Sequence, residues 1–436
     1  MLPSCGGSSS SGTHTSGLTY RAFLTNSVGS ASGPAGVYLV NAQTDVRPLP
    51  APPPISVGTI PGMMVVTPNR ARTLVFSGDG TQFSQNQFTI INNAKEAVDS
   101  AVLLPGFTES IVVSPDGSTA YAALPTAQVV GQSPGLVQAI SLSGAALTGQ
   151  VDVPSVHYLS IDNSGNRILG FSDNSDSVAV ITPSNIGIGN AVTAVGGFDR
   201  PVAAFFSSDD SIAYVLNCGA ECGGQQASVQ QLNLTDNKPG SKVALCTSGA
   251  NPQCAGSVAL VNSSTMYVAG TPYSAGGGPS LLCPAGTTQA TYCGLLTVVD
   301  LSGNMAVTNS GIVITDGYHD RIALGANGQL FIGAHTCTEI ATATETRGCL
   351  SIYNTLPATT VGSVPPGGVL IPPATGDVTG IQPIATRTVV YVIQNYSLSI
   401  YDATTDTLEN NPNDPNHPGQ IANLVGQFID VKTVDF

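Results

Sequence analysis

The chain has 436 residues, of which only 9% are charged, with 13 basic and 27 acidic residues and a net charge of −14. So few cations cannot neutralise a run of phosphates, which excludes nucleic-acid binding. No stretch of eighteen apolar residues is present, which excludes a membrane-spanning helix. The 49 glycines and 30 prolines, with abundant Val, Thr and Ser and no long stretch of helix formers, predict an all-β fold.

The first segment, residues 1–17, reads "MLPSCGGSSSSGTHTSG" and is predicted to be a flexible tether because it is rich in Gly and Ser. Its "LPSC" resembles the lipobox of bacterial lipoproteins, and this resemblance implies that Cys5 is lipidated. No charged or apolar signal region stands before Cys5, so either the sequence begins inside the signal peptide or the match is accidental. A lipid at Cys5 would be the only expected attachment to a membrane.

From residue 18 onward, two strand patterns alternate, and each occurs eight times. The first pattern is seen in "YRAFLTN", "TLVFSG", "TAYAAL", "RILGFS", "IAYVLN", "TMYVAG", "QLFIGA" and "VVYVIQN". The second is seen in "GVYLVNA", "FTIINNA", "VQAISLS", "VAVITPS", "VQQLNLT", "LTVVDLS", "LSIYNTL" and "LSIYDAT". A further strand before and after each pair gives four strands every 45 to 65 residues or so, the spacing of propeller blades. We therefore predict a single β-propeller domain over residues 18–436.

The inner strand of each blade, strand A, sets the blade count. Seven inner strands are predicted, beginning near Met63, Ser110, Tyr158, Val202, Ser257, Ile322 and Ile381. The first unit begins directly at its second strand, while the C-terminal "FIDVKTVDF" alternates like a strand that has no partner. We predict eight blades, with the C-terminal strand completing the first blade near residues 20–26; seven blades is the alternative. Both chain ends are then expected on the face of the A–B turns.

At "SPDGSTAYAAL", from Ser114, the chain resembles the YVTN-type, lactonase-like propeller family, as a pattern over nearly its whole length. The resemblance implies the propeller fold and leaves the function open. Tryptophan is absent, which disfavours the eight-bladed quinone-dependent alcohol dehydrogenases with their tryptophan docking repeats. The chain also has no Gly-x-Ser-x-Gly, His-Glu-x-x-His or Cys-x-x-Cys-His motif, and no cofactor is predicted.

Eight of the nine cysteines form four close pairs, and Cys5 is left over. The predicted disulfides are Cys218–Cys222, Cys246–Cys254, Cys283–Cys293 and Cys337–Cys349. A redox or metal pair is the alternative for "CGAEC", but neither histidines nor an acidic cluster flank it. Disulfides persist in oxidising compartments, so we expect an exported protein of the periplasm or outer cell surface.

Propeller topology gathers these cysteines on one face. The B–C and D–A connections of all blades share a face, opposite the A–B and C–D turns. The four loops that carry the predicted disulfides are B–C or D–A connections of blades 5 to 7, so they all lie on that face. Two interpretations remain open: the disulfides staple long loops that lack a core, or they hold a binding surface.

The same face collects the scarce charge. The residues expected around the channel mouth are Glu109, His157, Asp199, Arg200, His319, Asp320 and Arg321. Clustered titratable groups are candidates for an active site, although Asp/Arg pairs at these positions also commonly bond to loop backbone. In "SDNSDS", Asp173, Asn174 and Asp176 could offer oxygen ligands, but Asx-turns explain them better and no metal site is predicted.

Two functions follow. The first is a non-catalytic surface protein that binds an unknown protein or surface partner, or assembles with itself, through its stapled loop face. The second is a lactonase-like hydrolase with His157 or His319 as general base and Arg200 or Arg321 stabilising an oxyanion. An enzyme requires a histidine within hydrogen-bond reach of a carboxylate in an open pocket, whereas a scaffold can fill its channel mouth.

Overall fold

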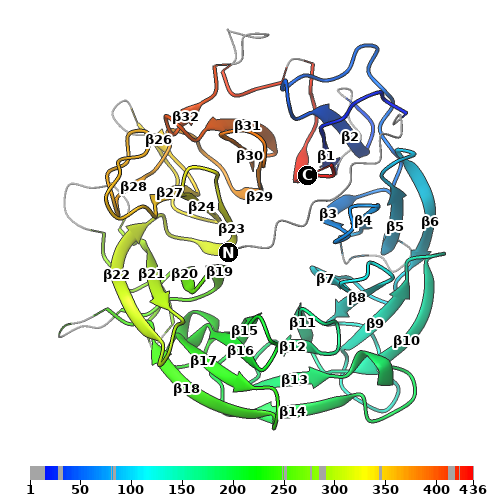
Figure 1. Ribbon diagram of the computed structural model, residues 1–436, viewed down its shortest axis with the longest axis vertical. Helices are drawn as coiled ribbons and strands as arrows, with labels where there is room; N and C mark the ends of the chain where they lie inside the picture. Colours follow the sequence, from blue (N-terminus) through cyan, green and yellow to red (C-terminus); the bar gives the residue numbers. More distant parts are fainter. Residues whose placement is uncertain are drawn as a thin grey trace.

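The computed structural model describes residues 15–27, 33–79, 81, 85–247, 249, 253–274, 277–283, 291–342, 346–410, 418–421 and 423–435. Its strands form eight antiparallel sheets arranged as blades around a central axis (Figure 1). Within these ranges the only helices are two short 3₁₀ turns, η2 (Pro183–Asn185) and η3 (Gly219–Cys222). The eight-bladed prediction is confirmed, and the seven-bladed alternative is wrong.

Blades 1 to 4 contain the following strands, from the channel outward. Blade 1 has β33 (Phe428–Thr433), β1 (Arg21–Asn26) and β2 (Gly36–Asn41). Blade 2 has β3 (Pro61–Val66), β4 (Arg72–Ser77), β5 (Gln87–Asn92) and β6 (Ala97–Leu103). Blade 3 has β7 (Ser110–Val113), β8 (Thr119–Leu124), β9 (Leu136–Ser141) and β10 (Ala146–Asp152). Blade 4 has β11 (Val156–Ile161), β12 (Ile168–Ser172), β13 (Ser177–Ile181) and β14 (Val192–Gly196).

Blades 5 to 8 continue in the same order. Blade 5 has β15 (Pro201–Phe206), β16 (Ile212–Asn217), β17 (Ser228–Asn233) and β18 (Lys238–Ala244). Blade 6 has β19 (Val258–Asn262), β20 (Thr265–Gly270), β21 (Gly294–Asp300) and β22 (Ala306–Ile314). Blade 7 has β23 (Tyr318–Leu324), β24 (Gln329–His335), β27 (Leu350–Asn354) and β28 (Val369–Leu370), with a separate hairpin of β25 (Ile340–Ala341) and β26 (Thr346–Arg347). Blade 8 has β29 (Val378–Pro383), β30 (Val389–Gln394), β31 (Ser397–Asp402) and β32 (Thr407–Leu408).

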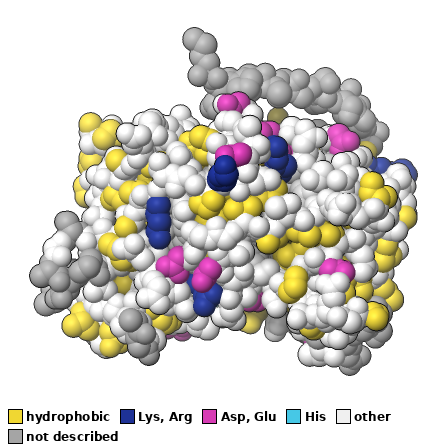
Figure 2. Space-filling model, turned by 90° about the horizontal axis from the view of Figure 1, so that it is seen from below, with side chains coloured by type: hydrophobic (Ala, Val, Ile, Leu, Met, Phe, Trp, Pro, Cys, Tyr) yellow, Lys and Arg dark blue, Asp and Glu magenta, His cyan; other side chains and the backbone are white. Residues whose placement is uncertain are grey.

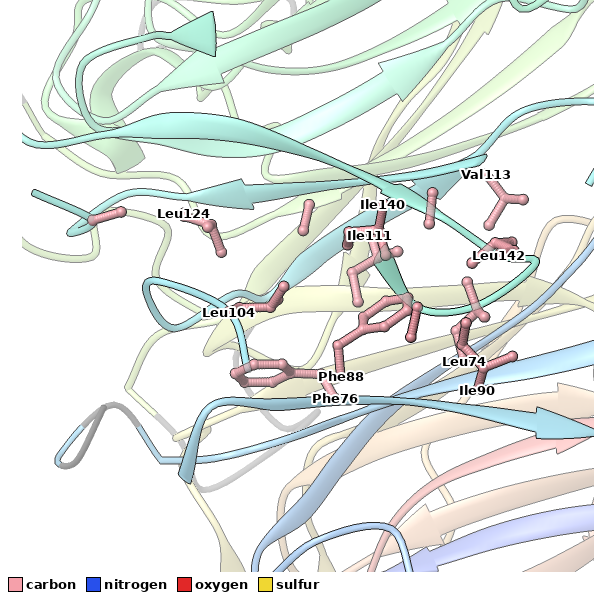
Figure 3. Packing of buried hydrophobic residues seen from close by; sticks show 14 of the residues in the cluster. Leu74, Phe76, Phe88, Ile90, Leu104, Ile111, Val113, Leu124, Ile140 and Leu142 are labelled. Atoms are coloured by element: carbon pink, nitrogen blue, oxygen red, sulfur yellow. The ribbon is translucent and has the colours of Figure 1, made fainter. Parts of the chain in front are cut away.

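The core lies between blades. Phe76 and Phe88 of blade 2 pack against Ile111 and Ile140 of blade 3 in one continuous buried cluster (Figure 3). Because each blade is covered on both faces, its second and third strands read as nearly unbroken apolar runs, and six consecutive residues of β1 are buried. The β-branched and aromatic composition of these runs explains why they form strands.

The ring closes as predicted. Strand β33 pairs antiparallel with β1, with Leu24 opposite Val431. The red C-terminal end of the chain lies beside β1 in Figure 1. The fourth position of blade 1 is reduced to a single bridge between Val37 and Ile55, so the preceding "PLPAPPP" is a connector. Several inner strands begin earlier than predicted; β23 begins at Tyr318, four residues before the expected Ile322.

The inner strands leave one edge toward the channel, and neighbouring blades satisfy their N–H groups. The Ser110 hydroxyl accepts from the Leu159 N–H at 2.9 Å, and the Ser160 hydroxyl accepts from the Ala204 N–H at 3.1 Å. Asp430 of β33 accepts in the same way from the Met64 N–H at 2.9 Å. These bonds fix the blades around the channel.

The segment before β1 lies on the turn face, as predicted. The Ser16 N–H and hydroxyl each donate to the Glu96 carboxylate at 2.6 Å, and Glu96 belongs to the β5–β6 turn. Cys5 and the predicted tether up to residue 14 fall outside the described residues.

Seen edge-on, the ring is mainly uncharged, with Lys, Arg, Asp and Glu side chains scattered among apolar ones (Figure 2). In the part of the chain that the structure describes, no helix is long and apolar enough to cross a bilayer.

Candidate functional site

The four predicted disulfides are present, closing loops with sequence separations of 4, 8, 10 and 12 residues. We call the whole connections between strands that contain these disulfides the stapled loops. Neighbouring stapled loops touch: the Gln226 side chain reaches Cys246 Sγ at 3.5 Å, and the Ser280 hydroxyl donates to the Gln253 side chain at 2.7 Å. Gly219 makes the tightest of these loops possible, because its φ is +67° and a Cβ would lie 2.2 Å from the Ala227 nitrogen.

His157, at the start of β11, is held between two carboxylates. Its Nε2 lies 2.8 Å from Glu109 and its Nδ1 lies 3.0 Å from Asp173, which follows β12. The hydrogen bond to Glu109, followed by the charge of Asp173, raises the pKa of His157, while the same bond lowers the pKa of Glu109. Because both ring nitrogens face carboxylates, His157 is stabilised as an imidazolium that ties blade 3 to blade 4.

A second cluster lies at the junction of blades 7 and 8. His335, at the end of β24, has its Nε2 2.9 Å from Asp320, and its Nδ1 lies 3.8 Å from Asp377. Asp320 also accepts from Arg321 at 2.7 Å, and Arg321 donates through Nε to the Thr379 carbonyl at 2.7 Å. The hydrogen bond to Asp320 raises the pKa of His335.

Two tyrosines join the clusters across the channel. The hydroxyls of Tyr158 in blade 4 and Tyr318 in blade 7 lie 2.9 Å apart. The Tyr158 ring stacks on His157 with ring centres 4.3 Å apart. Burial raises the pKa of both tyrosines, so both remain neutral hydroxyls. The pair forms a bar across the mouth.

An open cavity of about 740 Å³ lies beside this bar. Its polar lining includes Glu109, Asp320, Arg321 and His335, and its apolar lining includes Met63, Phe76, Phe107 and Val258. A smaller cavity of about 330 Å³ lies on the other side, lined by His157, Arg200 and Glu221. A cavity of the larger size suits a small organic ligand.

Three residues predicted for the channel mouth make structural contacts instead. His319 is fully buried and donates from Nε2 to the Thr315 carbonyl at 3.0 Å, and burial lowers its pKa to about 4. The prediction of His319 at the channel mouth is therefore wrong, since its side chain turns into the blade. Asp199 accepts from the backbone N–H groups of Gln225 and Gln226, and Arg200 pairs with Asp176 at 3.2 Å.

Asp199 and Arg200 thus hold the first stapled loop. This agrees with the interpretation that Asp/Arg pairs at these positions bond to loop backbone. In "SDNSDS", Asp173 faces His157 and Asp176 faces Arg200, which accounts for both carboxylates. Among the described residues, no group of three His, Cys, Asp or Glu side chains is placed to hold a metal ion.

Sequence reasoning missed His335, Asp377 and Glu221. His335 ends a second strand, where the chain leaves the blade on the same face as the D–A connections, and a search of both connection types would have found it. Glu221 projects from η3 against Gly270, where a Cβ would lie 2.5 Å from its Oε2. Burial raises the pKa of Glu221 to about 8, so it is a neutral acid at pH 7.

Glu221→Gln should change how stability depends on pH. The folded pKa lies above the ordinary value of 4.5, so the wild type loses stability as pH rises from about 4.5 toward 8, by at most about 1.4 kcal/mol per pH unit. Glutamine does not titrate, so the free energy of unfolding of the variant rises relative to that of the wild type between about pH 4.5 and pH 8. Urea unfolding between about pH 5 and pH 8 measures the difference. The exposed Glu339→Gln is the control; parallel curves for wild type and Glu221→Gln would contradict the expectation.

The fold and the mouth together define an eight-bladed β-propeller with a charged, cavity-bearing channel mouth. Two solved structures share the fold. A chain of Kuenenia stuttgartiensis hydrazine synthase is 12% identical with a TM-score of 0.54, covering 81% of this chain and 98% of that one. The dihydro-heme d1 dehydrogenase NirN is 12% identical with a TM-score of 0.56, covering 96% of this chain and 75% of that one.

At this identity the likeness extends to the fold alone. No protein-family model and no curated protein matches the sequence. The lactonase-like resemblance therefore rests on the turn and strand pattern of the chain itself.

Proposed function

We propose that this chain is an exported, lipid-anchored propeller that acts by binding at its channel mouth and not by catalysis. The observation that carries the proposal is the state of the mouth histidines. His157 has both ring nitrogens on carboxylates, and within the described ranges neither His157 nor His335 bonds a hydroxyl or thiol. A general base needs a free ring nitrogen directed at the proton that it removes. A histidine ring held by carboxylates on both sides serves to brace the rim of an open cavity.

Export is supported by the disulfides, because four of them require an oxidising compartment. Anchoring is supported by the "LPSC" motif and by the position of Ser16 on the turn face, opposite the mouth. A lipid on Cys5 would hold the turn face toward the membrane and leave the stapled loops and the mouth accessible to a partner. Cys5→Ser is expected to release the protein from the membrane fraction.

A lactonase-like hydrolase is the second candidate, and the geometry of His335 favours it. Its Nε2 is oriented by Asp320 while Nδ1 lies 3.8 Å from Asp377, beyond hydrogen-bonding distance. A base oriented by a carboxylate has this arrangement, and Arg321 beside it could stabilise an oxyanion.

Hydrolysis assays separate the two. We expect the purified protein to hydrolyse a series of lactones no faster than buffer, because no nucleophilic side chain of the described residues is hydrogen-bonded to His157 or His335. His335→Gln should leave that result unchanged, and His157→Gln serves as the matched control. Lactone hydrolysis that disappears in folded His335→Gln but persists in His157→Gln would establish the hydrolase instead.

A further inference from the structure

The lining of the larger cavity at the channel mouth contains a buried hydrogen-bond acceptor that has no donor in the described structure. Of the polar side-chain atoms that line it among the described residues, one is buried and lacks a partner, Asp320 Oδ1. The other oxygen of Asp320 already accepts from Arg321 and His335. A buried carboxylate oxygen without a partner costs free energy until a donor reaches it.

A second acceptor stands on the rim. Glu109 receives its hydrogen bond from His157 on Oε2, and its side chain remains 54% exposed, with Oε1 unpartnered in the described structure. The hydrogen bond from His157 lowers the pKa of Glu109, so the group is ionised at pH 7. The cavity thus has one acceptor exposed on its rim, Glu109, and one buried acceptor without a partner in its lining, Asp320 Oδ1.

Arg321 and His335 also line the cavity but already pair with Asp320, and the rest of the wall favours a cation over a neutral donor. The rings of Phe107, Tyr158 and Tyr318 line the cavity, and aromatic faces attract cations. The chain carries a net charge of −14, which raises the local concentration of cations and repels anions.

We propose that this cavity binds a small organic ammonium ion, whose N–H groups donate to Glu109 and approach the Asp320 carboxylate while its alkyl part lies against Met63 and Phe107. This inference rests on the proposed binding function and names its ligand class. Either a free alkylamine or the side chain of a lysine on a partner presents this chemistry; the cavity volume of about 740 Å³ beside the tyrosine bar accommodates a whole small molecule and favours the free amine.

The test compares three probes of similar shape, pentan-1-amine, pentan-1-ol and pentanoate, by calorimetric titration of the full chain at pH 7 and low salt. We expect saturable binding of the amine, at least roughly tenfold tighter than the alcohol, because a charged hydrogen bond contributes more than a neutral one. N-acetyl-lysine amide is the second arm, and we expect it to bind more weakly than the free amine.

Glu109→Gln should weaken amine binding roughly tenfold. The matched control, Asp236→Asn in the β17–β18 turn, should leave it unchanged; Asp236 pairs only with the exposed Lys238 in the described structure. Amine binding no tighter than alcohol binding, or unaffected by Glu109→Gln, would overturn the inference. Preference for the alcohol or pentanoate would reject the ammonium but keep a binding function, whereas turnover of a ligand would reject the binding function itself.

Discussion

Arg21→Met is expected to destabilise the protein by about 3–5 kcal/mol, because it leaves buried carboxylates without their cation. The Arg21 side chain is 1% exposed and lies at the ring closure. Its Nε donates to Asp435 at 2.9 Å, just beyond β33, and its Nη1 lies 3.0 Å from Glu96 of blade 2. One side chain therefore connects β1, the closing strand and the next blade.

Urea unfolding monitored by tyrosine fluorescence measures this loss. The control is Lys238→Met, which removes a cation from an exposed surface pair with Asp236 and should cost less than about 1 kcal/mol. Equal losses in the two variants would show that the Arg21 cluster contributes nothing beyond an ordinary surface pair.

Reduction of the disulfides is expected to bring the protein close to unfolding. By loop entropy each of the four contributes roughly 2–3 kcal/mol, and together they amount to roughly 10 kcal/mol, comparable with the whole stability of a typical domain. Cys337–Cys349 closes the longest loop and should contribute most. The measurement is the unfolding midpoint with and without reductant, with thiol alkylation and mass spectrometry to confirm reduction.

A paired substitution distinguishes loop entropy from other effects of reductant. Cys337→Ala with Cys349→Ala should cost more than Cys218→Ala with Cys222→Ala, since the sequence separations are 12 and 4. A fully reduced protein with an unchanged midpoint would contradict the expectation and remove the argument for an oxidising compartment.

The fold could be predicted from the sequence because the strand pattern of a blade recurs eight times along the chain. The missing inner strand of the first unit and the unpaired "FIDVKTVDF" together predicted the closure that β33 and β1 make. Strand starts were less certain: Tyr318 begins β23 although its side chain is 40% exposed, so no apolar run marks that boundary.

The candidate site was only partly predictable. Topology placed Glu109 and His157 on one face, and the structure brings them within 2.8 Å. His319 follows Tyr318 directly, and successive residues of a strand point to opposite sides, so one faces the channel and the other the core. The burial of Glu221 depends on a stapled loop folding back over blade 6, a long-range packing event that local sequence does not encode.

The closing pair also has a consequence for how the chain reaches its folded state. Strands β1 and β33 are separated by about 400 residues, whereas the strands of every other blade follow one another along the chain, with the β25–β26 hairpin inserted in blade 7. During synthesis and export, β1 and β2 form a hairpin before β33 is available to pair with it. Until then, one edge of the hairpin and its apolar side chains that face blade 8 are uncovered. Such an edge invites pairing with another chain. Protection of this hairpin, by export in an unfolded state or by a chaperone, is therefore expected to govern the yield of closed rings more than the stability of any single blade.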